Sequence, residues 1–355
     1  MAEAHQHHVC ALLAVDRPPR RPGHPAISDE DEIEARDVTT PSIEAHDLTK
    51  HFGELVAVDH LSFSVSPGEI FGLLGRNGSG KTTTVRMLTT LLRPTSGAAV
   101  IAGFDVARQP DDVRRSSGVT LQDAALDPNM TGREHLNLIG RLLQFGKREV
   151  TARATELLEA FGLSAAADRR IGTYSGGMQR RLDIATALFA RPPVLFLDEP
   201  TSGLDPQSRR ALWDEILRLR ADGTTVLLTT QYLEEADQLA DRIGVIDSGK
   251  LIAGGTPREL RAAHGLRTIT VPGEHHLTTL VVTVTAGTVT ARDGLTIIDV
   301  LPDASIDEAL AQIRSVAGTL EDITVTKASL EDVFVHLTGR EINTASARST
   351  DRAAA

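Results

Sequence analysis

Hydrophobic positions divide the chain into short strand-like runs separated by longer helix-like patterns. Segments 42–48 and 61–65 alternate apolar and polar residues, as half-buried strands do. Continuous apolar runs of the length typical of buried strands lie at 70–74, 194–197 and 226–229. Apolar residues recur at helical spacing in segments 133–144, 152–161, 178–189 and 207–221. Strands that alternate with helices predict an α/β fold with a largely parallel sheet covered on both faces.

The pattern also predicts how the chain is organised. We expect a disordered tail over 1–41, a main α/β domain over 42–265, a smaller α+β domain over 266–340 and a disordered tail over 341–355. A helical subdomain is expected at about 123–190 of the main domain. The N-terminal tail holds His5, His7 and His8. A solvated tail is favoured over a metal site for these histidines, because no further ligand stands at a metal-binding spacing.

The smaller domain has its own strand and helix signals. Strands are expected at 280–284, 296–300 and 323–326. Ser305 and Ser329 are candidate helix N-caps, and each has an acidic residue three positions later, as in a capping box. These signals predict an α+β unit.

Charge and composition narrow the function. The chain has 37 Lys and Arg residues against 48 Asp and Glu residues, a net charge of −11, which argues against binding nucleic acid by general attraction. Its single cysteine, Cys10, cannot form an internal disulfide and suits a reducing cytoplasm. No apolar run approaches the roughly 20 residues that a membrane span needs, and 1–26 lacks the apolar core of a signal peptide. We therefore expect a cytoplasmic protein that relies on other chains for any membrane spans.

One glycine-rich loop predicts nucleotide binding. It follows the apolar run 70–74, precedes a helical pattern and fits G-x-x-x-x-G-K-[ST] without mismatch. Contacts to ATP are expected from Gly75, Arg76, Asn77, Gly78, Ser79, Gly80, Lys81, Thr82 and Thr83. Backbone N–H groups and the helix N-terminus attract phosphate, while Lys81 reaches the β- and γ-phosphates and the Thr82 hydroxyl binds Mg²⁺.

Two carboxylates end the apolar run 194–197. Asp198 is predicted to lie at the carboxyl edge of a buried strand, where it can hold Mg²⁺ through water. Pro200 breaks the strand, so Glu199 can face the γ-phosphate and polarise an attacking water. The alternative, a solvated acidic strand end, loses favour beside a phosphate loop.

A second anion-binding helix terminus is predicted inside a long insertion. Lys81 and Asp198 are 117 residues apart, which is long for a minimal phosphate-loop protein. The insertion contains Ser175-Gly176-Gly177-Met178-Gln179, in which Ser175 can cap a helix whose glycines expose N–H groups. In isolation, an ordinary capped helix after a glycine turn would be the favoured interpretation.

Over about residues 43–260, these motifs resemble the nucleotide-binding subunit of ATP-binding cassette (ABC) transporters. The resemblance implies a phosphate-loop ATPase domain of ABC type with an inserted helical subdomain. It also implies roles for individual residues: Phe52 stacks on adenine, Gln122 is the Q-loop glutamine that contacts ATP and Mg²⁺, and Asp205 belongs to the D-loop. Ser175, Gly176, Gly177 and Gln179 would form the signature motif that contacts the ATP of a partner subunit. A head-to-tail pair follows, made of two copies or of one copy and a paralogue.

Two positions depart from the family pattern. Tyr174 stands where leucine is common, and little effect is expected there. Gln231 occupies the position of the switch histidine. A glutamine can hydrogen-bond the γ-phosphate and the attacking water but cannot become cationic, so we assign Gln231 a catalytic positioning role.

The second domain points to a subfamily. Residues 330–339 resemble the C-terminal motif of daunorubicin/doxorubicin-resistance-type exporters, as does the stretch that begins at Gln231. The simpler interpretation of 330–339 is an amphipathic helix that packs on its own domain, and the two interpretations are compatible.

The leading hypothesis is an ATP-hydrolysing energy-coupling subunit of an ABC exporter, with ATP and Mg²⁺ as its ligands. By resemblance, it would lie at the inner face of the cell membrane on a separate ABC-2-type permease that exports a drug or hydrophobic secondary metabolite. The segment between Gln122 and Glu134 would receive that permease. The alternatives are a soluble ABC ATPase acting on ribosomes or DNA, which usually has two cassettes or a coiled-coil insertion, and a nucleotide-binding regulator. Intact Lys81 and Glu199 argue against the regulator.

Overall fold

The computed structural model describes residues 40–122, 125–264, 267–272, 289–292, 295–300, 305–317, 323–326 and 329–338. The strand expected at 280–284, the tail histidines and the C-terminal tail lie outside these residues. The limits of the predicted domains remain a proposal.

A six-stranded sheet forms the centre of the main domain, in the order β10-β9-β3-β8-β7-β6. Its strands are β3 (Ile70–Leu74), β6 (Ser117–Thr120), β7 (Val194–Asp198), β8 (Thr225–Thr230), β9 (Arg242–Asp247) and β10 (Lys250–Gly255). Five strands run parallel, and β10 pairs antiparallel with β9 at the edge. The three apolar runs are the fully buried strands β3, β7 and β8, so the α/β prediction is confirmed. Their carboxyl ends meet at one edge of the sheet, where ligands bind in such folds.

A second, antiparallel sheet packs beside the first. It has the order β2-β1-β4-β5 and consists of β1 (Ile43–Phe52), β2 (Leu55–Val65), β4 (Ser96–Ile101) and β5 (Phe104–Asp105). Its inner face shares one apolar core with β3, β7 and the helix α2 (Lys81–Leu88) that follows the phosphate loop. The alternating strands at 42–48 and 61–65 are therefore present, but in a sheet of their own.

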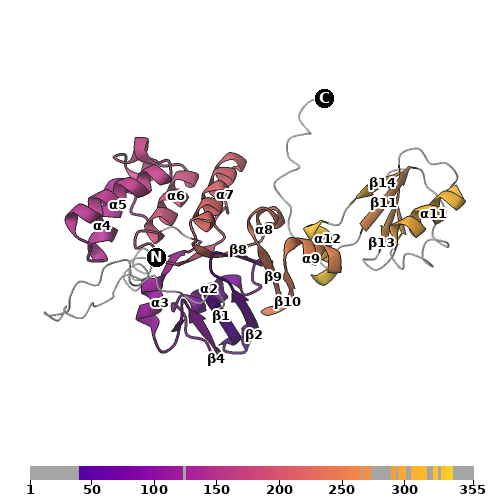
Figure 1. Cartoon of the computed structure of the whole chain (residues 1–355), viewed down its shortest axis with the longest axis horizontal. Helices are drawn as coiled ribbons and strands as arrows, with labels where there is room; N and C mark the ends of the chain where they lie inside the picture. Colours follow the sequence, from indigo (N-terminus) through magenta and orange to yellow (C-terminus); the bar gives the residue numbers. More distant parts are fainter. Residues whose placement is uncertain are drawn as a thin grey trace.

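The four predicted helical patterns are all helices. They are α4 (Gly132–Leu142), α5 (Lys147–Ala160), α6 (Gly176–Ala187) and α7 (Pro206–Ala221). Figure 1 shows α4, α5 and α6 grouped together, joined to the sheet beside α7. A capping box starts α4, in which Thr131 Oγ1 accepts from the Glu134 N–H at 3.1 Å. Short 3₁₀ turns at Ser164–Ala166 and Ile171–Thr173 connect α5 to α6, and α3 (Pro110–Ser116) precedes β6.

The C-terminal part forms a small sheet of order β12-β13-β11-β14. Its strands are β11 (Arg267–Pro272), β12 (Val289–Arg292), β13 (Leu295–Val300) and β14 (Thr324–Thr326), and α11 (Ile306–Ala317) packs on them around Ile269, Ile298 and Ile313. The N–H of Glu308 donates to Ser305 Oγ at 3.4 Å, and that of Asp332 donates to Ser329 Oγ at 3.1 Å, as the capping signals predicted.

Among the described residues, the last helix, α12 (Leu330–Thr338), packs on the main domain and not in the core of this small sheet. Its buried residues Leu330, Val333 and Phe334 share a core with the main domain. That core is built from α8 (Leu233–Leu239), α9 (Pro257–His264), β9 and the end of β3, and Figure 1 shows α12 beside α9. The expectation that 330–339 packs on its own domain is wrong, because the apolar face of α12 meets the apolar faces of α8 and α9. None of the helices within the described residues combines the length and apolar character of a membrane span.

Candidate nucleotide-binding site

The glycine loop wraps closely over the start of α2. Gly78 and Gly80 have φ angles of 80° and 107°, in the region that favours glycine. A Cβ at Gly80 would lie 2.5 Å from Ala57 O, and one at Gly75 would collide with Ile246 O. No side chain fits at Gly75 or Gly80, so the loop stays close against its neighbours. The N–H of Gly75 donates to Thr230 O and that of Ser79 donates to Arg76 O, so the anion cradle at the helix N-terminus would use the other N–H groups of the loop.

Lys81 places its ammonium group inside this loop. The side chain is 3% exposed, and Nζ donates to Gly75 O at 2.8 Å and to Arg76 O at 3.0 Å. Glu199 Oε1 lies 3.3 Å from Nζ. Burial lowers the pKa of Lys81, and the carboxylates of Glu199 and Asp198 oppose that shift. A buried cation is thus held where phosphate oxygens would lie.

The residues around Asp198 fit a divalent cation. Asp198 is fully buried, and its Oδ1 accepts from Thr82 Oγ1 at 3.2 Å and from Thr229 Oγ1 at 2.5 Å. Its Oδ2 is buried without a hydrogen-bond partner among the described residues. Hydroxyl and carboxylate oxygens are the ligands that Mg²⁺ prefers, and an unpartnered buried carboxylate oxygen is costly unless something binds it.

Glu199 follows in a strained backbone conformation. Its φ angle is 46°, in the left-handed region, which is uncommon for a residue with a Cβ. Its N–H donates to Thr229 O at 3.1 Å, so the turn is tied to β8. The turn directs the side chain toward Lys81 rather than along the strand.

A cavity of about 440 Å³ opens over the loop. Its lining includes Phe52, Leu55, Gln122 and Glu199, with Asn77, Gly78 and Gly80 of the loop and Lys81, Thr82 and Thr83 of α2. The cavity lining does not include Gly75, Arg76 or Ser79, which the sequence also predicted to contact ATP. Phe52 is 48% exposed and Leu55 is 65% exposed, although both are large apolar side chains. The volume lies within the range of ligand pockets, and exposed apolar surface at one end suits stacking of a nucleobase.

Gln231 lies near this site without lining the cavity. It directly follows β8, is half-buried, and its neighbour Thr230 accepts from the N–H of Gly75 at 3.1 Å. Its position is compatible with the predicted positioning role, which stays a prediction.

The signature residues and Asp205 lie together, apart from the cavity. Ser175 Oγ accepts from the N–H of Met178 at 3.3 Å and caps α6. Asp205 caps α7 by accepting from the N–H of Ser208 at 2.9 Å. A Cβ at Gly177 would lie 2.7 Å from Ser208 Oγ, so the two helix starts are in close contact. The cavity over the phosphate loop has no lining residue from 175–179. Gln179 instead donates to Ile171 O at 3.3 Å within its own subdomain.

Sequence reasoning missed two residues of the site. Thr229 bonds Asp198 from the neighbouring strand, and nothing in the apolar run 226–229 indicates that partner. Arg180 is 7% exposed and contacts the backbone on both sides of Glu199. Its signal was the three-residue spacing from Asp183 on an otherwise apolar helix face, which is typical of an ion pair.

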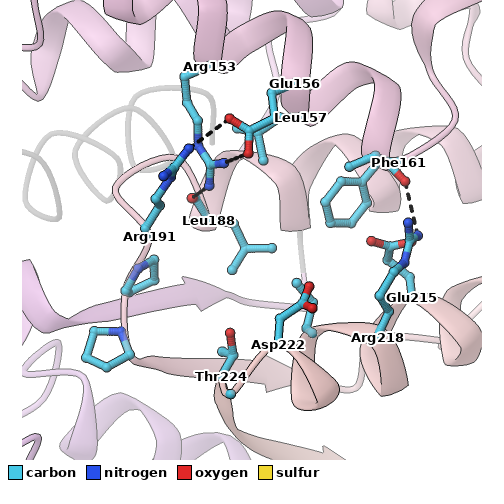
Figure 2. Close-up of a pocket in the computed structure, with 15 residues that line it drawn as sticks. Arg153, Glu156, Leu157, Phe161, Leu188, Arg191, Glu215, Arg218, Asp222 and Thr224 are labelled. Carbon is cyan, nitrogen blue, oxygen red and sulfur yellow. Dashed lines mark hydrogen bonds and ion pairs between the residues drawn. The ribbon is translucent and has the colours of Figure 1, made fainter.

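A second cavity has a volume of about 400 Å³. It lies between α5, the end of α6 and α7, and its lining residues are drawn in Figure 2. Its arginines are already paired: Arg153 donates to Leu188 O at 2.7 Å and to Glu156, and Arg218 donates to Ala160 O at 3.1 Å. Cations at carbonyl ends of helices are stabilising, so we interpret this cavity as a structural joint between the helical subdomain and α7.

Known proteins match the chain along most of its length. The family described as ABC transporter matches residues 58–202. The daunorubicin resistance ATP-binding protein DrrA2 of Streptomyces coeruleorubidus is 46% identical over 315 residues, covering 86% of this chain and 98% of that protein. A Nod factor export ATP-binding protein I of Paraburkholderia xenovorans is 40% identical, covering 85% and 98%.

Solved structures agree with the fold. An ATP-binding cassette of an ABC transporter in its ADP conformation aligns with a TM-score of 0.56 and 29% identity, covering 62% of this chain and 93% of the other. The cradle, the buried Lys81 and the paired Asp198 and Thr82 thus occur in a chain whose relatives are ABC ATP-binding proteins. The chain belongs to the ATP-binding proteins of ABC transporters, in the group that includes the daunorubicin and doxorubicin resistance proteins.

Proposed function

We propose that this ABC ATPase is the energy-coupling subunit of an exporter and drives a separate membrane permease of the ABC-2 type. The cargo class is a drug or hydrophobic secondary metabolite. The observation that carries the ATPase assignment is Asp198: its Oδ1 accepts from Thr82 at the start of α2, and its Oδ2 is buried without a hydrogen-bond partner among the described residues. The names of relatives that cover 86% and 89% of this chain support the export assignment.

Each residue of the site has a definite part in hydrolysis. The loop N–H groups and Lys81 hold the phosphates and draw negative charge toward the loop as the terminal phosphate is transferred. Thr82 and Asp198, with Gln122, would hold Mg²⁺, which neutralises phosphate charge when bound. Glu199 polarises the attacking water, and Gln231 orients it. Phe52 provides the surface on which adenine stacks.

The separation of the two anion-binding helix starts supports a pair of ATPase domains. The N-terminus of α6 is capped and exposed at Ser175 and Gly176 but lies outside the cavity of its own chain. A second copy or a paralogue, placed head to tail, would bring its signature residues over this cavity. The permease and the paired ATPase would lie at the inner face of the cell membrane.

The experiment combines turnover with transport. The full chain is purified, and phosphate release is measured with ATP, with and without Mg²⁺, for the unmodified protein and Glu199→Gln. The chain is then co-expressed with a candidate permease of the ABC-2 type, and ATP-driven accumulation of an anthracycline is measured in inside-out vesicles. Mg²⁺-dependent turnover with ATP-driven accumulation is expected. Turnover together with sedimentation on ribosomes and no permease association would overturn the export assignment.

A further inference from the structure

We infer that Arg180 is a positioning residue for ATP hydrolysis, because from α6 it holds the backbone on both sides of Glu199 and the backbone just before Gln122. This inference rests on the proposed ATPase function. Arg180 is not among the residues that line the nucleotide cavity, so its effect would pass through the two loops that it binds.

The guanidinium of Arg180 bonds three backbone carbonyls from two loops. Nε donates to Pro200 O at 3.0 Å, and Nη2 donates to Asp198 O at 2.9 Å. Nη1 donates to Leu121 O at 2.6 Å. The planar fork of an arginine can satisfy such a set of acceptors at fixed angles, which a lysine ammonium cannot.

Asp183 supplies the counter-charge for this buried cation. It lies one turn further along α6, and its Oδ2 accepts from Arg180 Nη1 at 3.1 Å. Burial raises the pKa of Asp183 to about 6, and Arg180 opposes that shift. Burying the charge of an arginine costs free energy unless a carboxylate pairs with it. We therefore treat Arg180 and Asp183 as one buried ion pair.

The hydrogen bonds of Arg180 hold the backbone next to Glu199, the residue with the strained conformation. Glu199 has a φ of 46°, and Arg180 binds the carbonyls of the residues immediately before and after it. A left-handed residue with a Cβ persists only when its surroundings hold it there. The Leu121 bond ties the same guanidinium to the residue before Gln122. One side chain therefore sets the relative position of the predicted water-polarising carboxylate and the predicted Mg²⁺-binding amide.

Arg181 provides a matched control. It is the next residue on the same helix and has the same side chain, but it donates to Phe161 O at 3.0 Å and to Gly177 O at 3.4 Å. Within the described part of the chain, neither of these hydrogen bonds reaches the loops at 121–122 or 198–200.

The test compares Arg180→Lys, Arg180→Ala and Arg181→Ala in the full chain. Steady-state kinetics gives kcat and KM for ATP, a fluorescent nucleotide reports affinity, and thermal melting reports folding. We expect both Arg180 variants to lose about 10- to 100-fold in kcat, as displaced catalytic groups do, with KM and affinity nearly unchanged. Arg181→Ala should keep kcat within about threefold. Millimolar guanidinium should restore part of the turnover of Arg180→Ala and of no other variant.

The outcomes separate the two proposals. If the unmodified protein has no Mg²⁺-dependent turnover, the proposed function fails. If it turns over and Arg180→Lys keeps its kcat, only the positioning role fails. A loss of affinity in step with kcat, or an equal loss in Arg181→Ala, would assign Arg180 a general structural role and overturn the inference. Arg180→Lys keeps the charge, so it decides the question even if Arg180→Ala does not fold.

Discussion

At the scale of single residues, Gln231 allows the catalytic arrangement to be tested without disturbing the phosphate cradle. Gln231→His should be tolerated and should add a dependence of kcat on pH near the imidazole pKa of about 6.5, because histidine titrates there and glutamine and alanine at this position do not titrate. Gln231→Ala should lower kcat more than ATP affinity, since its contact matters most as charge moves during the reaction. Steady-state turnover of the three proteins between about pH 5.5 and 8.5 measures this. Equal rates in all three would show that Gln231 has no catalytic part.

His135 predicts how the stability of the helical subdomain depends on pH. It is buried on α4, and its Nε2 has no hydrogen-bond partner in the part of the chain that the structure describes. Burial lowers its pKa to about 4, while Asp127 opposes the shift. Between the unfolded pKa of about 6.5 and the folded value, the unfolded chain binds a proton that the folded chain does not. The free energy of unfolding contributed by this residue therefore falls as the pH falls through that window.

The variant for this prediction is His135→Gln, which cannot take up a proton. On acidification from about pH 7 to 4.5, the unmodified protein should lose more stability than the variant, by up to about 3 kcal/mol. Urea unfolding of both proteins at several pH values gives the free energy of unfolding of each. The difference between the two proteins cancels the contributions of Asp183 and of other groups that both share. Parallel pH profiles would contradict the assignment of a neutral buried His135.

At the scale of elements, α12 stabilises a domain distant from it in the sequence. Phe334 is buried against residues of α8, α9 and β9, including Ala236, Leu260 and Val245. Phe334→Ala should destabilise the main domain by about 3 kcal/mol or more, because it leaves a cavity in this core. Val325→Ala is the control, since Val325 on β14 is 40% exposed. Urea unfolding followed by the fluorescence of Trp213, on α7 of the main domain, measures both variants.

Removal of residues 266–355, which include α12, tests whether the contact of α12 with α8 and α9 stabilises the main domain. Every nucleotide motif precedes residue 235, so the shortened chain should still bind ATP. It would expose the apolar faces of α8 and α9 that α12 covers, so we expect a lower melting temperature and more aggregation than for the full chain. A shortened chain as stable as the full one would mean that α12 contributes no net stability.

At the scale of the whole molecule, Glu199→Gln should form an ATP-dependent dimer. The substitution removes the carboxylate that polarises water but leaves Lys81 and the cradle intact, so ATP stays bound and unhydrolysed. The exposed start of α6 is then available to complete the site of a second copy. Light scattering coupled to size exclusion, with and without ATP, measures the mass. The control Lys81→Ala in the same background should lose ATP affinity and remain monomeric. Finding only monomer in Glu199→Gln with ATP, while the unmodified protein dimerises, would contradict the closed-dimer mechanism.

The features that the sequence determined by itself depend on the spacing of residues close together in the chain. The phosphate loop, the three buried strands, and the caps at Ser305 and Ser329 all follow from patterns a few residues long, because turn geometry and side-chain periodicity act between near neighbours. The position of Asp198 at a strand end was predicted in the same way, because it directly follows an apolar run of the length of a buried strand.

Only the tertiary structure decided which distant residues complete the site. Thr82 and Thr229 bond Asp198 across 116 and 31 residues, and Arg180 reaches Leu121 across 59. The choice of α8 and α9 as the surface that buries α12 is likewise non-local. An apolar face or an arginine in a sequence specifies that it needs a partner but not which one. The partner is selected by the order of strands in the sheet and by the shapes of the surfaces that meet, and both depend on the whole chain at once.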